Sequence, residues 1–414
     1  MADNKQNTNP NVPNLRFPEF TEDWAQYKCS DLLEFYSTNS LSWEQLDYDN
    51  NDLLNLHYGL IHVGLPTLVN VEQHNLPSVK PEFKPKNYTL CKSGDIAFAD
   101  ASEDTNEVAK PIEFYDCSDK QVVCGLHTIH GRDKLNATEI GFKGYAFSSM
   151  PFHHKIRRLA QGSKIYSISS KNFSEVTIGI PQKEEQRKIV DLLSKLEERI
   201  TTQNKIIEDL KKLKVAISQV CFEQKPIDEI PLHKFFKKGK AGGTPTSTNK
   251  EYYDGEIPFL SINDITEQGK YIYSTEKHLS EKGLLNSSAW VVPVNSLILS
   301  MYASVGLTTI NKIPLATSQA MFSMELKEPE LIDFLYYYLT YFKYRYIHRY
   351  LETGTQSNIN ADIVRSIKIP NYGKSKNIEM SAMLANIDKK IEIENIYIQS
   401  LLSQKAYLLS NMFI

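Results

Sequence analysis

Two stretches of this sequence decide its architecture. Residues 193–222 read LSKLEERITTQNKIIEDLKKLKVAISQVCF, and residues 384–413 read LANIDKKIEIENIYIQSLLSQKAYLLSNMF. Neither stretch contains Gly or Pro, and apolar residues recur at alternating spacings of three and four, which predicts a long helix with one apolar stripe. Adding 191 to each stripe position of the first stretch gives a stripe position of the second, polar interruptions included. We therefore predict an internally duplicated chain.

Each stripe needs a partner, because a helix of about 40 residues would extend for roughly 60 Å with its apolar side exposed to water. The simplest partner is the other stripe. The predicted seam consists of Leu196, Ile200, Gln203, Ile207, Leu210, Lys214, Ile217, Ile387, Ile391, Glu394, Ile398, Leu401, Lys405 and Leu408.

The polar seam residues indicate the direction of the pair. An antiparallel pair would bring Lys214 opposite Glu394. The same register would bring Gln203 opposite Lys405. A parallel pair would instead oppose Lys214 to Lys405 and place like charges in a buried seam. The pattern favours antiparallel packing with an approximate two-fold axis inside one chain, and the alternative left open is that each helix packs on its own globular domain.

The regions before the two helices correspond more weakly. Leu159–Ser163 can be set against Leu351–Thr355, and Ile178–Pro181 against Ile367–Pro370. Both regions mix short β-branched and aromatic runs with Gly, Pro and Asn, so each is expected to be an α+β domain. The predicted organisation is a globular domain over residues 1–180, a helix over 181–225, a second globular domain over 226–370 and a second helix over 371–414.

The composition bounds the class of protein. The chain has 414 residues, 41% of them apolar, which allows two domains with their own cores. Five cysteines are an odd and sparse set that argues against a disulfide framework. No apolar run of membrane-spanning length and no signal pattern occurs, so we expect a cytoplasmic protein without membrane contact. The net charge of -3 gives no support for nucleic-acid binding, so any such site must be a local basic face.

Motifs of catalysis are missing or incomplete. Gly373–Ser375 is similar to the end of a phosphate-binding loop, but Lys368 stands where that motif requires Gly. The nearest approach to the Asn-Pro-Pro-aromatic box of adenine methyltransferases is Ser149–Phe152. We expect no catalytic residue in this chain.

One group of residues has the right types for a metal site. Cys117, Cys124, His127 and His130 offer thiols and imidazoles, which hold zinc tetrahedrally in many proteins. Their spacing is wider than in knuckle-type zinc sites, which use closer cysteine pairs. The sequence therefore predicts no metal site.

The segments Gly242–Pro245 and Glu251–Ile265 resemble the opening of target-recognition domains in the specificity subunits of type I restriction-modification enzymes. Gly125–Thr128, Leu159–Gly162 and Pro181–Gln186 agree with the same family. Two segments depart from its pattern: Tyr36–Trp43 replaces the Gly-Gly-Thr-Pro opening in the first domain, and Asn371–Lys374 opens the second helix without Glu-Glu-Gln.

The resemblance implies a non-catalytic subunit for phage defence. Each recognition domain would read one half of a bipartite double-stranded DNA target, and the helices would space the domains and dock two modification (methyltransferase) subunits. Restriction (motor-nuclease) subunits would bind to those. S-adenosylmethionine, ATP and Mg would belong to the partner subunits and not to this chain. Major-groove reading from one side of the duplex would favour half-sites about one turn, near 34 Å, apart.

Basic residues and small polar loops supply the candidate DNA contacts, because Lys and Arg meet phosphates and Arg, Asn and Gln can also bond base edges. A solvated helix face and an ordinary turn are the alternatives. The DNA-binding candidates are Lys155, Arg157, Arg158, Ser163, Lys164 and Tyr166 in the first domain and Lys343, Arg345, Arg349, Thr355, Gln356 and Asn358 in the second.

Two rival functions stay open from the sequence. A fused methyltransferase-nuclease acting alone would need an active site built from scattered residues. A protein-protein scaffold without a DNA role would suit the slightly acidic charge balance.

Overall fold

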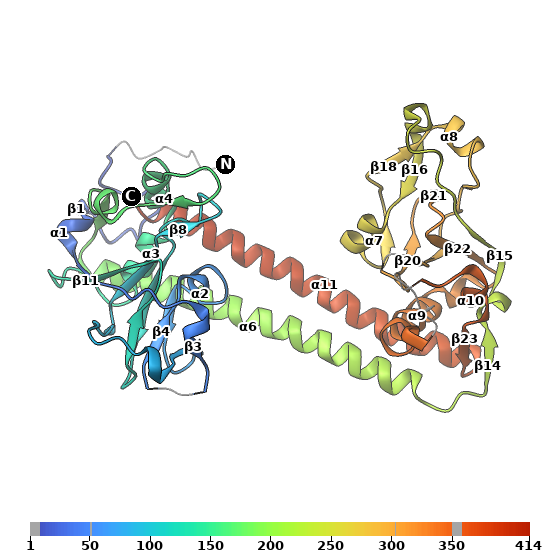
Figure 1. The fold of residues 1–414 in the computed structure, drawn as a ribbon, viewed down its shortest axis with the longest axis horizontal. Helices are drawn as coiled ribbons and strands as arrows, with labels where there is room; N and C mark the ends of the chain where they lie inside the picture. The colour runs from blue at the N-terminus through green and yellow to red at the C-terminus, as the bar shows by residue number, and fades with distance from the viewer. Residues whose placement is uncertain (1–8, 50–51, 303, 350–357) are drawn as a thin grey trace. The chain divides into compact units, whose positions relative to one another are not determined.

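The computed structural model describes residues 9–49, 52–302, 304–349 and 358–414 (Figure 1). The chain divides into two compact units, Met1–Asn204 with Tyr397–Ile414 and Lys205–Ile396. Each unit therefore contains one globular domain and part of both long helices, α6 (Lys183–Phe222) and α11 (Lys374–Asn411).

The first unit is built on a five-stranded sheet, blue to teal in Figure 1. Its strands, in spatial order, are β2 (Leu33–Tyr36), β11 (Thr128–Asp133), β7 (Ile96–Ala99), β9 (Pro111–Asp116) and β5 (Leu68–Asn70). Along the central strand, Ile96 and Phe98 enter one apolar cluster while Ala97 and Ala99 enter another. This follows from the alternation of side chains along a strand, so both faces of the sheet are covered.

Different elements cover the two faces. The cluster around Phe98 includes residues of α3 (Phe142–Phe147) and α4 (Met150–Arg157). The cluster around Ala97 includes residues of a second, four-stranded sheet and of α2 (Tyr58–His62). That sheet has the order β10 (Val122–Cys124), β4 (Leu54–Leu56), β6 (Ser78–Val79) and β3 (Leu46–Asp47).

The second unit repeats the five-stranded sheet. Its strands, in spatial order, are β15 (Phe236–Ala241), β22 (Met321–Leu326), β19 (Leu297–Ser300), β20 (Thr308–Asn311) and β17 (Tyr271–Ile272). In both sheets the first four strands are antiparallel and the last pair is parallel. The duplication predicted from the helices therefore extends through the globular domains, and the α+β fold with two repeated domains is confirmed.

Other parts of the second unit follow the same plan. The helix α9 (Ile332–Arg345) contributes its apolar side to the main core, as α3 and α4 do in the first unit. The second unit also contains a smaller, three-stranded sheet. Its strands, in spatial order, are β18 (Lys277–Leu279), β16 (Tyr253–Leu260) and β21 (Ala316–Thr317). A two-stranded ribbon joins the ends of each domain, β1 (Ala25–Lys28) with β13 (Thr177–Ile180) and β14 (Asp228–Pro231) with β23 (Lys368–Asn371).

Within each unit the two long helices run in opposite directions. In the first unit, Ile189 and Leu193 share a core with Met412 and Phe413. In the second unit, the end of α6 at Phe222 shares a core with residues near the start of α11. The antiparallel prediction is confirmed. All fourteen residues of the predicted seam are buried or half-buried.

The predicted charge pairing across the seam is wrong. Lys214 Nζ lies 2.5 Å from Asp388 Oδ1, and Glu394 pairs with Lys390 on its own helix. Lys405 Nζ lies 2.5 Å from Glu197 Oε1 instead of facing Gln203. The acids that receive the lysines lie beside the stripe and not in it, because a lysine leaving a half-buried seam ends at the edge where its ammonium meets water.

Among the described residues, no helix is both long enough and apolar enough to cross a membrane.

Candidate nucleic-acid interface

The exposed basic loop of the first unit follows α4. Ser149 caps this helix by accepting a hydrogen bond from the Phe152 N–H at 3.4 Å, and Phe152 and Ile156 bury one side of it. The opposite side presents Arg158, which is exposed, and Arg157, which donates to Asn106 Oδ1 at 2.9 Å. The amphipathic spacing of this short helix thus places both arginines outside the core.

Backbone hydrogen bonds and one glycine fix the shape of the loop after α4. Gln161 and Ser167 exchange two backbone hydrogen bonds of 2.9 and 2.8 Å. Between them Gly162 adopts a φ of +138°, and a Cβ there would lie 1.9 Å from the Ile165 carbonyl oxygen. Only glycine fits this conformation. As a result the side chains of Ser163 and Lys164 are exposed.

Two residues predicted to contact DNA, Lys155 and Tyr166, have partners within the first unit. Lys155 donates to the Thr177 carbonyl oxygen at 2.9 Å, and burial lowers the pKa of this lysine. Its ammonium is therefore used inside the domain. Tyr166 is half-buried in β12 (Tyr166–Ser167), which pairs with β8 (Ala101–Ser102).

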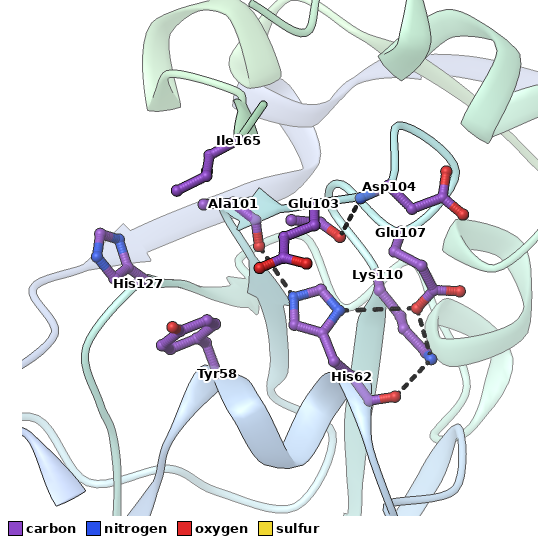
Figure 2. Close-up of a pocket in the computed structure, with 10 residues that line it drawn as sticks. Tyr58, His62, Ala101, Glu103, Asp104, Glu107, Lys110, His127 and Ile165 are labelled. Carbon is purple, nitrogen blue, oxygen red and sulfur yellow. Dashed lines mark hydrogen bonds and ion pairs between the residues drawn. The ribbon is translucent and has the colours of Figure 1, made fainter. Parts of the chain in front are cut away.

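A cavity of about 560 Å³ lies beside this loop, and sequence reasoning missed most of it (Figure 2). Ile165 of the loop lines it, opposite Tyr58 and His62 of α2. His127 lies on another wall, 3.2 Å from Asp100 Oδ1 through Nδ1. His127 belonged to a family-like segment, but no periodicity or spacing marked the other lining residues.

Charged groups form one side of the cavity. Lys110 Nζ lies 2.7 Å from Glu107 Oε2, and His62 Nδ1 lies 3.7 Å from the same oxygen. The His62 ring, followed by Lys110, lowers the pKa of Glu107 to about 2, and Glu107 in turn raises the pKa of His62. Together with Glu103 and Asp104, this wall offers carboxylate acceptors, which suit the amino groups of bases better than phosphates.

The position of His127 depends on a close backbone contact. A Cβ at Gly125 would lie 2.6 Å from Asn55 Nδ2 and 2.8 Å from the Leu56 carbonyl oxygen. The Gly125 N–H donates to that carbonyl at 2.9 Å. The chain then turns through His127 at a φ of 54° before β11 begins. The family-like segment Gly125–Thr128 is thus a turn that presents an imidazole to the cavity.

The candidates in the second unit are partly described. Arg349 is exposed and lies over the Tyr346 ring, 5.1 Å from its centroid. Arg345 pairs with Glu223 at 3.6 Å, and burial lowers the pKa of Lys343. Asn358 is half-buried. Thr355 and Gln356 lie outside the described residues.

A second repeated feature joins each domain to the helix pair. In the first unit, Glu197 accepts hydrogen bonds from Tyr145 Oη at 3.1 Å and from Lys405 Nζ at 2.5 Å. In the second unit, Asp388 accepts one from Tyr337 Oη at 2.7 Å and pairs with Lys214. We call these the Tyr-acid-Lys clusters. Both the acids and the lysines are 191 residues apart, so the clusters are equivalent under the duplication.

The four residues considered for zinc from the sequence, Cys117, Cys124, His127 and His130, do not come together as one set. His127 is exposed at the cavity, whereas His130 is fully buried on β11 and bonded to Asp95. These two side chains serve different surroundings although they are three residues apart.

The fold and these contacts define a class of protein. It is a scaffold that repeats one α+β domain and attaches each copy to a pair of long helices. Residues 118–212 and 225–403 match the family described as the type I restriction modification DNA specificity domain. Since the matched residues make up more than half of the chain, the protein belongs to that family.

Individual relatives agree with the family. The chain is 27% identical over 183 residues to the type I restriction enzyme MjaIX specificity subunit of Methanocaldococcus jannaschii, covering 41% of each chain. It is 30% identical over 137 residues to the HindI specificity subunit of Haemophilus influenzae, covering 33% of this chain and 30% of that one. The match thus spans less than half the length of either relative.

A solved structure shows the same fold over nearly the whole chain. The S subunit of a type I restriction-modification system from M. genitalium superposes with a TM-score of 0.57, covering 97% of this chain and 99% of that one. The sequence identity is 17%, so this likeness concerns the fold alone.

Proposed function

We propose that this chain is a non-catalytic DNA-specificity subunit in which each globular domain reads one half of a bipartite target. The repeated five-stranded sheet is the observation that carries the proposal. A chain that presents the same domain twice offers two related surfaces to one duplex, and the divergence of the two sequences allows each surface to read different bases. Family membership supplies DNA as the ligand.

In the first unit the proposed contact surface combines the loop and the cavity. Arg158 and Lys164 would meet phosphates, since both are exposed and cationic. The carboxylates and His127 at the cavity would face base edges, because carboxylates accept hydrogen bonds from the amino groups of cytosine. Lys155 is not part of this surface. In the second unit Arg349 is the described residue best placed for a phosphate.

We infer that the long helices dock two modification subunits, with restriction subunits bound to those. Exposed side chains of the helices support this: Leu192 and Met383 are exposed at equivalent positions, and so are Ile206 and Tyr397. Apolar side chains repeated by the duplication suit two copies of one partner. S-adenosylmethionine, ATP and Mg would be bound by those partners, and adenine methylation would be their chemistry.

Methylome sequencing of a host with and without this gene tests the proposal. We expect one bipartite adenine-methylated motif to disappear on deletion and to return on complementation. An unchanged methylome in a host that expresses the partner subunits would contradict the proposal. Binding of the assembled complex to duplex DNA should also weaken steeply with salt, because phosphate contacts release counterions.

A further inference from the structure

Two cysteines and one histidine meet inside the first unit. One ligand atom from each of Cys91, Cys124 and His130 lies within 4.8 Å of the other two, and all three residues are buried. The two sulfur atoms are 3.5 Å apart. The sequence did not indicate this set, because Cys91 lies far from Cys124 along the chain, and Cys124 and His130 were considered only together with Cys117 and His127.

The fold explains how these residues converge. Cys124 ends β10, and the Cys91 N–H donates to the Val122 carbonyl of the same strand at 2.8 Å. On β11, Ile129 enters the cluster with Phe98, so the next residue, His130, points to the opposite face of the sheet. That face carries the apolar cluster that contains Cys91 and Cys124.

The histidine is prepared as a ligand. Its Nε2 lies 2.8 Å from Asp95 Oδ2, and Arg132 holds the same carboxylate through two contacts of 2.7 Å. A carboxylate accepts a proton donor, so Nε2 is the nitrogen that donates to Asp95, and in the neutral ring Nδ1 is the nitrogen left to bind a ligand. A carboxylate behind a histidine is the usual outer arrangement of a metal-bound imidazole.

The remaining nitrogen of His130 is unexplained by the protein alone. Among the described residues, Nδ1 has no hydrogen-bond partner, and the side chain is fully buried. Leaving a buried polar atom unsatisfied is unfavourable, so native structures seldom do so without a ligand, an ion or water. Nδ1 is therefore available to a metal ion, which the two neighbouring sulfur atoms favour over water.

We propose that Cys91, Cys124 and His130 bind a zinc ion through two thiolates and Nδ1. Zinc bonds of about 2.3 Å to sulfur in tetrahedral geometry place two sulfurs about 3.8 Å apart, close to the spacing observed here. Two thiolates also neutralise the dication, which suits a buried site. The fourth position would be open to water or to a further side chain.

A disulfide between Cys91 and Cys124 is the alternative use of the two sulfurs. It would need an oxidant, and it would leave Nδ1 of His130 without a partner. The metal satisfies all three side chains at once, so the geometry favours it.

The zinc would have a positioning role. It would fix the end of β10, and the turn Gly125–Thr128 that presents His127 to the cavity follows directly. This inference concerns metal content and stands independently of the proposed DNA function.

The test uses the full chain, purified under reducing conditions with trace zinc. We expect about one zinc per chain by mass spectrometry of the metal, and a thiolate-to-cobalt charge-transfer band after replacement by cobalt. Cys91→Ser, Cys124→Ser and His130→Gln should each lose the metal. Cys221→Ser removes an equally buried thiol in the second unit and should retain it.

Wild-type measurements keep the proposal testable if the ligand variants fail to fold. A chelator that removes zinc should make the Cys91 and Cys124 thiols reactive in the wild-type chain. Absence of zinc together with absence of the cobalt band would overturn the proposal, and so would a Cys91–Cys124 disulfide in the purified protein. Equal metal loss from Cys221→Ser would overturn the assignment of these ligands.

Discussion

Glu107 illustrates how single residues set the character of the cavity in the first unit. It is shared between a histidine and a lysine, and its pKa of about 2 keeps it ionised at every physiological pH. Together with Glu103 and Asp104, it gives the cavity lining three carboxylates against the single permanent cation Lys110 and the titratable His62 and His127. Under the proposed function, phosphate contacts would come from the loop, and the cavity would recognise hydrogen-bond donors of the bases.

Glu107 and His62 make the free energy of unfolding depend on pH. Glu107 stabilises the fold above its unfolded pKa of about 4.5, and this is lost as the pH falls toward 2. His62, whose pKa is raised, contributes below about 6.5 and loses its contribution as the pH rises through its folded value. Glu107→Gln should therefore cost most between about pH 4.5 and 6.5, on the order of 1 kcal/mol because the pair is partly exposed.

Thermal unfolding of Glu107→Gln at pH 5.5 and 8.5 measures this effect. The exposed Glu103→Gln, on the same cavity wall, is the matched control and should change little. An equal loss at both pH values would argue against the role of His62.

Gly162 makes a second prediction at the residue scale. A side chain here must displace the Ile165 carbonyl, so Gly162→Ala should move the loop. Under the proposed function this should weaken DNA binding by the assembled complex about tenfold, or 1.4 kcal/mol. Gly64→Ala is the control, because Gly64 also has a positive φ in the first unit but has no atom within 4 Å of a built Cβ. Fluorescence anisotropy with target duplex would measure both, and equal effects would discount the loop.

At the scale of elements, the Tyr-acid-Lys clusters connect each domain to both long helices. The acid in each cluster lies on one long helix, the lysine on the other and the tyrosine on a helix of the domain. In the first unit the Lys405 and Glu197 side chains are 24% and 15% exposed, so their interaction is less screened by water than a surface pair. One contact thus sets the register of the helix pair and the attachment of the domain.

A double-mutant cycle tests this contact. Lys405→Met and Glu197→Gln should each destabilise the chain by roughly 2 kcal/mol, because each leaves one partly buried charge without its opposite charge, and the double variant should lose less than the sum. Urea unfolding gives the free energies. The exposed pair Lys195 and Asp191 is the control and should couple by about 0.5 kcal/mol or less. Additive effects at the first pair would refute the coupling.

The helices show what sequence reasoning could and could not reach. Their stripe is a local periodic property, so the seam was predictable from spacing. The antiparallel direction was predicted from the like charges that a parallel pair would oppose, although the individual charge pairs differ from those expected. The partner of Lys214 was not, because Asp388 lies outside the stripe and is reached only through the actual helix register. Likewise the cavity unites α2 with residues 101–110 and 165, which only the sheet topology brings together. The strand order was not predictable either, because the two domain sequences have diverged while the order of their strands is the same.

At the scale of the whole molecule, two domains of one topology predict separable effects on the target. Under the proposed function, combining Arg158→Ala with His127→Ala should relax or abolish recognition of one half of the motif and leave the other half unchanged. Arg349→Ala should affect the other half. Methylome sequencing of the variant strains reads both halves at once, and loss of both halves in a folded variant would contradict independent reading.

The division of the chain into units also fixes an order of events during synthesis. The core of the first unit contains Phe413, whose ring centroid lies 6.2 Å from that of Trp24 and 6.0 Å from that of Phe142. Residues 205–396 leave the ribosome before this phenylalanine does, so the unit that starts first is completed after the whole of the other. Until then its apolar surface is available to chaperones, and a nascent chain interrupted before Tyr397 would be marked for degradation by that same exposed surface.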